Sequence, residues 1–258
     1  MGTRSRSLFF ILILATFLSP FAMRGNSRVT PAWDIGALEE AREAGSQESF
    51  ERDAKLLSEA LAFSVSQGQN RVKLPGRFRP YAQAGFHLFQ VEADVLREYT
   101  TTGSAPLFSR TIFAKAGVGL PFGLNVEGGM SQVISDHKTT ALHLSIGGQT
   151  LDFANLVYID LVPAVSTSGT VTKTIMGPSL WNFSGQAVVG AYHRLTLAQV
   201  GYILQYNFVS LTALNPSISN SFFRHGVMTH VPLYKGVFVQ TEVFYPSMSA
   251  TVSGGFQF

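Results

Sequence analysis

The sequence contains no cysteine among its 258 residues. Disulfides, thiolate metal ligands, cysteine nucleophiles and lipid attachment through an amino-terminal cysteine are therefore excluded. Charged residues are also scarce: they make up 14% of the chain, against about 25% in an average soluble domain. The net charge of +3 is small and scattered along the chain, so the sequence does not favour a nucleic-acid partner.

The chain has no apolar run as long as the roughly 20 residues that a membrane-spanning helix needs. The one long apolar run is residues 8–18, which follows Arg4 and Arg6 and is broken by Pro20. A basic start followed by a short apolar stretch is typical of an export signal. We expect residues 1–22 to form a signal peptide that is cleaved after Ala22.

The next part of the chain, residues 23–76, differs from the remainder in being acidic and helical in pattern. Eight acidic and three basic residues lie between Asp34 and Glu59. Apolar side chains recur at helical spacing over residues 49–64, and a weaker helix is predicted at 36–44. Three roles are open for this segment: a periplasmic linker or docking arm, a plug in a lumen, or an oligomerisation element. We favour a periplasmic location, with a periplasmic partner for residues 36–64.

From residue 77 onward, apolar and polar side chains alternate with a period of two, which is the pattern of β-strands with one apolar face. The carboxy-terminal residues are the clearest example, with Phe256 and Phe258 on one face and Gln257 on the other. The sequence predicts an all-β fold of about ten antiparallel strands. They cover residues 89–95, 111–118, 124–131, 142–147, 157–161, 181–192, 198–207, 223–233, 237–243 and 250–258.

The predicted links between these strands alternate in length. Longer polar links are predicted at residues 99–106, 134–140, 166–178 and 210–221, and tight turns at 121–123, 193–194 and 235–236. Bacterial outer-membrane barrels have short turns on the periplasmic side and longer loops outside. An even number of strands would place both ends of the barrel in the periplasm.

These features resemble those of Gram-negative outer-membrane β-barrel proteins, and the resemblance covers residues 78–258. It implies a transmembrane barrel over residues 77–258, located in the outer membrane and in contact with its lipid. It also implies that Phe256 and Phe258 form the signal that the barrel-assembly machinery recognises. A barrel of ten strands would have a closed or very narrow lumen.

Four charged residues are predicted to face this lumen. Lys115 and Glu127 lie opposite each other if the hairpin is centred on Pro121, and Glu92 and Asp94 point inward from the preceding strand. Such a cluster is either an ion-pair network that braces the barrel or the lining of a polar constriction.

The sequence offers little catalytic chemistry. None of its six histidines has the spacing of a metal site, and no cofactor is expected. His143 and Ser145 share the lumen face, and a His-x-Ser pair is similar to that of outer-membrane lipid A deacylases. We expect no enzyme activity. The predicted function is a passive small-solute pore or a structural and interaction role in the envelope; the alternative is a lipid hydrolase that uses His143 and Ser145.

Overall fold

The computed structural model describes most of the chain from Leu38 onward. The described residues are 38–40, 43, 47–65, 79–90, 108–120, 123–134, 139–152, 160–193, 195–214, 216–234, 236–245 and 248–257. The expected signal peptide and the predicted site residues Glu92, Asp94 and Phe258 lie outside them.

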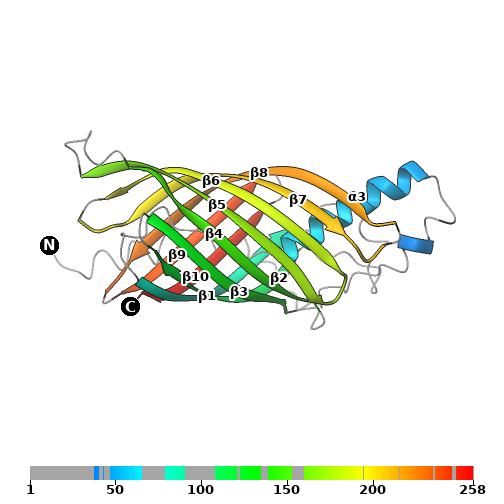
Figure 1. Cartoon of the computed structure of the whole chain (residues 1–258), viewed down its shortest axis with the longest axis horizontal. Helices are drawn as coiled ribbons and strands as arrows, with labels where there is room; N and C mark the ends of the chain where they lie inside the picture. Colours follow the sequence, from blue (N-terminus) through cyan, green and yellow to red (C-terminus); the bar gives the residue numbers. More distant parts are fainter. Residues whose placement is uncertain are drawn as a thin grey trace.

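Ten antiparallel strands close into a barrel in which each strand pairs with its sequence neighbours and β1 pairs with β10 (Figure 1). The strands are β1 (Arg79–Gln90), β2 (Phe108–Gly119), β3 (Leu124–Val133), β4 (Thr140–Asp152), β5 (Leu161–Met176), β6 (Leu180–His193), β7 (Gln199–Leu211), β8 (Ile218–Pro232), β9 (Val237–Tyr245) and β10 (Ser249–Gln257). The predicted fold class, an all-β barrel of ten strands preceded by a short helical segment, is confirmed.

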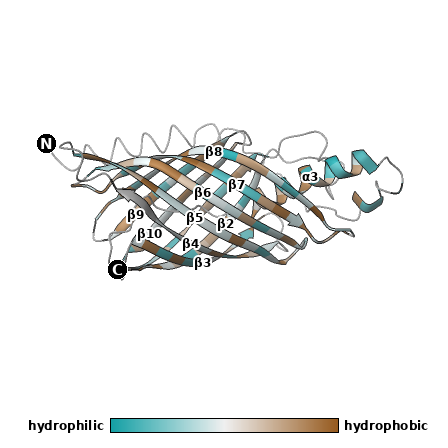
Figure 2. Ribbon diagram, turned by 45° about the horizontal axis from the view of Figure 1, so that its top comes forward, coloured by the Kyte–Doolittle hydropathy of each residue, from teal (hydrophilic) through white to brown (hydrophobic). Residues whose placement is uncertain are grey.

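Most polar side chains of the strands lie inside the barrel, and apolar side chains cover its outside; some apolar residues, such as Ile203 and Met228, are also buried inside. In β7, Gln199, Gln205 and Asn207 are buried in the lumen, while Tyr202 and Leu204 are each 44% exposed on the exterior. Hydrophobic residues, brown in Figure 2, alternate with more hydrophilic ones along the strands of the barrel wall. An apolar exterior around a polar interior is the reverse of a soluble domain and matches a barrel that faces lipid.

Two strands differ from the sequence prediction. β1 begins ten residues before the predicted first strand. The prediction missed this start because the outward face carries small residues such as Ala82 and Ala84, which contrast little with the polar inward face. β5 runs through residues 166–176, where a loop was predicted. In this part of β5, Ser and Thr fill the inward positions, and the outward positions include Thr167 and Gly169. The two faces therefore differ little in polarity. The prediction of a long loop at 166–178 was wrong.

The two ends of the barrel have different connections. At one end, which we call the turn end, tight links join β2 to β3, β6 to β7 and β8 to β9, with positive φ angles at Gly123, Leu197 and Gly236. β1 begins and β10 ends at this turn end, because Arg79 pairs with Gly119 at the end of β2. We call the opposite end, where β7 is joined to β8 through residues 212–217, the loop end; it also has a tight link, between β5 and β6, with a positive φ angle at Gly177.

The helix α3 (Gln47–Ser64) enters the barrel from the loop end (Figure 1). Its predicted span of 49–64 is close to the observed one. The helix contacts β1, β2, β6, β7 and β8, with more contacts to β8 than to any other strand. None of the helices in the described ranges is long and apolar enough to cross a membrane.

Glycines allow large side chains to lie flat across the inner wall. At Gly85 in β1, a Cβ atom would lie 2.4 Å from the backbone oxygen of Val252 and 2.8 Å from the Phe113 ring. The pairing of β1 with β10 leaves no room for that atom. Gly169 in β5 faces outward, and a Cβ atom there would meet nothing within 4 Å.

We expect Gly85→Val to reduce the yield of folded barrel strongly, because the side chain collides with the backbone of the strand that closes the sheet. Gly169→Val is the matched control and should fold like the parent protein. Heat-modifiable migration on gels measures the folded fraction of both variants. Equal folded fractions for the two variants would contradict the observed closure between β1 and β10.

Candidate functional site: the barrel lumen and its helix

A row of residues in register crosses the inner wall near the turn end. Tyr81 pairs with Gly117, Gly117 with Glu127, Glu127 with Ser145, and Ser145 with Thr170. All five positions face the lumen because each pairing joins the same face of neighbouring strands. The register of the sheet therefore assembles a polar belt from residues that lie far apart in the sequence.

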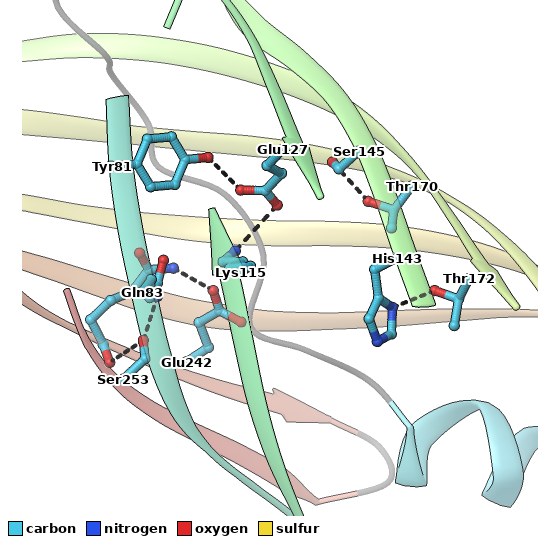
Figure 3. Close-up of polar contacts among 11 residues, drawn as sticks. Tyr81, Gln83, Lys115, Glu127, His143, Ser145, Thr170, Thr172, Glu242 and Ser253 are labelled. Atoms are coloured by element: carbon cyan, nitrogen blue, oxygen red, sulfur yellow. Dashed lines mark hydrogen bonds and ion pairs between the residues drawn. The ribbon is translucent and has the colours of Figure 1, made fainter. Parts of the chain in front are cut away.

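Glu127 is the centre of this belt (Figure 3). The Tyr81 hydroxyl donates to Glu127 Oε2 over 2.5 Å, and Lys115 Nζ lies 3.2 Å from Glu127 Oε1. Gly117 permits the first contact, since a Cβ atom there would lie 2.6 Å from the Tyr81 hydroxyl. Both charged side chains are almost fully buried, so each is the partner that makes the burial of the other tolerable.

A second charged group lies closer to the loop end. Arg224 of β8 is buried, and its Nε donates to Gln205 Oε1 over 2.5 Å. Its guanidinium carbon lies 4.0 Å from the ring centre of Phe244 and 4.9 Å from that of Phe63 in α3. Stacking on two aromatic rings stabilises a cation that is removed from water. Arg224 therefore joins the wall of the barrel to the helix.

His143 and Ser145 do not interact as a catalytic pair. Ser145 Oγ accepts a hydrogen bond from Thr170, while His143 contacts Ser131 Oγ at 2.8 Å and Thr172 Oγ1 at 2.9 Å. The Ser131 hydroxyl donates to the backbone oxygen of Val65, the residue that follows α3. Because that donation uses the only Ser131 proton, His143 Nε2 donates to Ser131 and Nδ1 accepts from Thr172. His143 thus supports the residue that holds the end of the helix.

Apolar packing holds α3 in the loop-end mouth. Leu57, Leu61 and Phe63 of the helix are each at most 4% exposed. They belong to one buried cluster with wall residues Phe89, Val133, Ala141, Leu180, Val209, Leu211 and Leu214. The Phe63 ring lies 4.9 Å from Phe89 and 5.0 Å from Phe222, between centroids. Of the three roles considered for this segment, these contacts correspond to a plug.

Polar contacts fix the rim of the same interface. The Asn220 amide donates to Glu59 Oε1 over 2.8 Å, from β8 to the helix. Burial raises the pKa of Glu59 above its ordinary value, and the hydrogen bond from Asn220 opposes that rise in part. Glu59 is therefore a helix residue whose ionisation is disfavoured by docking.

The predicted site residues have different outcomes in the structure. Lys115 and Glu127 form an ion pair, but they are diagonal in the hairpin, since Lys115 pairs with Gly129. Glu92 and Asp94 lie outside the described residues. Phe256 faces outward from β10 and is 38% exposed.

The predicted lumen cluster did not include Tyr81, Arg224 or Glu242, although all three are buried inside the barrel. Tyr81 lies in a strand whose start was predicted too late. Arg224 and Glu242 lie on the faces opposite the apolar positions of their predicted strands, so strand alternation could have identified them. Within the described part of the chain, no group of three or more His, Asp or Glu residues could hold a metal ion.

No protein-family model and no curated protein matches this sequence. Among solved structures, the barrel is similar to the attachment invasion locus protein Ail of Yersinia pestis, with 10% identity, a TM-score of 0.22, and 70% of this chain and 97% of that chain covered. A triple mutant of the Rhodopseudomonas blastica porin matches with 8% identity, a TM-score of 0.24, and 70% and 99% coverage. A structure reported for the asymmetric conductivity of engineered proteins matches with 9% identity, a TM-score of 0.23, and 70% and 99% coverage. These values support no inference about function.

We expect Lys115→Met to destabilise the barrel by about 3 kcal/mol or more, because Glu127 then remains buried without its cation. The double variant Lys115→Met, Glu127→Gln removes both charges and should recover most of that loss. Denaturant unfolding of the barrel in lipid vesicles measures the three free energies. A double variant no more stable than Lys115→Met would show that the two charges do not depend on each other.

Glu59→Gln should strengthen the docking of α3 at neutral pH, because the amide oxygen still accepts from Asn220 while the partly buried charge is removed. The sign follows from the raised pKa: the stabilisation from protonated Glu59 is present at low pH and is lost as the pH rises through the folded-state pKa. Hydrogen exchange of the α3 amides, compared between the two proteins at equal pH, should show a difference that shrinks toward acid pH. A constant difference would exclude Glu59 as its source.

Proposed function

We propose that this protein is an outer-membrane β-barrel that is closed at rest by its own helix α3 and that serves as a passive pore for small polar solutes when α3 leaves the mouth. The observation that carries the proposal is the apolar cluster around Leu57, Leu61 and Phe63, which fills the loop-end mouth. The apolar exterior of the strands supports the membrane location.

The chemistry of the lumen favours uncharged polar solutes. In the described residues, Lys115 and Arg224 face the lumen together with Glu127 and Glu242, so the interior charges balance. The rest of the wall carries amides and hydroxyls. The side-chain amide of Gln186 is buried, and neither of its polar atoms has a hydrogen-bond partner among the described residues. Groups of this kind are normally satisfied by water or by a polar ligand.

A catalytic role receives no support from the geometry of the alternative site. A serine nucleophile needs a base within hydrogen-bond reach, whereas His143 is engaged with Ser131 and Thr172. We therefore propose a non-enzymatic role. The outward position of Phe256 in the last strand is compatible with its proposed recognition by the barrel-assembly machinery.

Conductance in planar bilayers tests the pore. The parent protein is expected to be silent or to open rarely, because α3 occupies the mouth. The double variant Leu57→Asp, Leu61→Asp places two carboxylates in the apolar cluster, so the helix should undock and the barrel should conduct in small steps. Glu48→Ala, on the exposed face of the helix, is the control and should behave like the parent protein.

The pore proposal would be contradicted if the double variant folds, hydrogen exchange shows that α3 has undocked, and no conductance is seen. The structural role would then remain. The same silence with α3 still protected would call for a stronger undocking variant, so exchange is recorded on every sample. Steady conductance of the parent protein would contradict the closed resting state.

A further inference from the structure

α3 and the start of the barrel lie at opposite ends of the lumen. The buried cluster that contains Leu57 and Phe63 also contains Leu38 and the loop-end residues Leu180 and Leu214. β1 begins at Arg79, which pairs with Gly119 beside the tight turn between β2 and β3. The described amino-terminal residues therefore lie at the loop end, whereas the first strand begins at the turn end.

The wall contacts of Val65 show how far into the barrel the helical segment reaches. The backbone oxygen of Val65 accepts from Ser131. Ser131 pairs with Phe113, and Phe113 pairs with Gly85, a residue in the middle of β1. The carboxy-terminal end of the helical segment is therefore inside the barrel, with wall on the turn side of it as well as on the loop side.

In an outer-membrane barrel with an even number of strands, both barrel ends and the short turns lie in the periplasm, and the loops lie outside. The turn end of this barrel has both barrel ends, since β1 begins and β10 ends there. The loop end, with α3 in its mouth, is then the end that faces away from the cell. This placement of α3 differs from the periplasmic location expected from the sequence for residues 23–76.

We propose that α3 lies in the outer mouth of its own barrel, so that its exposed face lies on the outer surface of the cell. The proposal rests on the outer-membrane location proposed above. Its structural basis is the position of the described residues: α3 packs in the loop-end mouth, and Val65, which follows it, contacts the inner wall through Ser131.

The exposed face of α3 then becomes a surface feature. Glu48, Glu51, Arg52 and Lys55 are exposed on the helix, while the opposite face is buried in the barrel. Two wall contacts anchor the helix in this mouth: Ser131 donates to the backbone oxygen of Val65, and Asn220 donates to Glu59. The barrel thereby displays a short charged helix at its outer mouth while keeping the lumen closed.

Single cysteines in this cysteine-free chain test the topology in intact cells. Glu48→Cys reports on α3, Ser217→Cys on the loop end and Leu195→Cys, in the turn between β6 and β7, on the turn end; all three positions are exposed. The probe is a maleimide on a polyethylene glycol too large to enter the periplasm. We expect Glu48→Cys and Ser217→Cys to be labelled on intact cells to within a factor of two of each other, and Leu195→Cys only after permeabilisation.

Labelling of Ser217→Cys but not Glu48→Cys on intact cells, with Glu48→Cys labelled after permeabilisation, would overturn the proposal while preserving the barrel. Labelling of Leu195→Cys alone on intact cells would overturn it by reversing the barrel. Recovery of all three proteins in a soluble fraction would instead remove the outer-membrane location itself. Heat-modifiable migration of each variant verifies that the labelled protein is folded.

Discussion

The pairing of β1 with β10 is the constraint on which the rest of the molecule depends. In hydrocarbon an open sheet edge would leave backbone N–H and C=O groups unpaired, at a cost of several kcal/mol per group. Closure removes both edges and turns one face of every strand outward and the other toward a shared interior. Gly85 and Gly255 lie along this seam, where a side chain would meet the neighbouring backbone or the ring of Phe238.

The interior is organised by the same register that closes the sheet. Tyr81 reaches Glu127 across Gly117, and the Lys115 ammonium completes the neutralisation of the carboxylate. A buried ion pair adds little net stability compared with apolar packing, but breaking it leaves a charge without compensation. The belt therefore specifies how the wall residues fit together more than it stabilises the barrel as a whole.

α3 gives the loop-end mouth of the barrel an apolar core. A barrel in lipid has no need of a hydrophobic interior, yet the loop-end mouth is lined by Leu180, Leu211 and Leu214, which pack on the helix. His143, which the sequence placed in a hypothetical catalytic pair, supports Ser131 in holding the end of this segment. The same contacts close the lumen and fix the helical segment at the end of the barrel opposite the start of β1.

The sequence by itself determined the strand alternation, the strand number, the helical segment and the inward direction of Lys115, Glu127, His143 and Ser145, because period-two patterning depends only on neighbouring residues. It did not locate β1 or the full length of β5, whose faces differ too little in polarity to be read as strands. Only the tertiary structure decided that Lys115 and Glu127 are diagonal, that Tyr81 joins them, and that His143 serves the helix and not Ser145. Those relations depend on strand register and on where a distant helix packs, and both are set by long-range contacts that local periodicity does not contain.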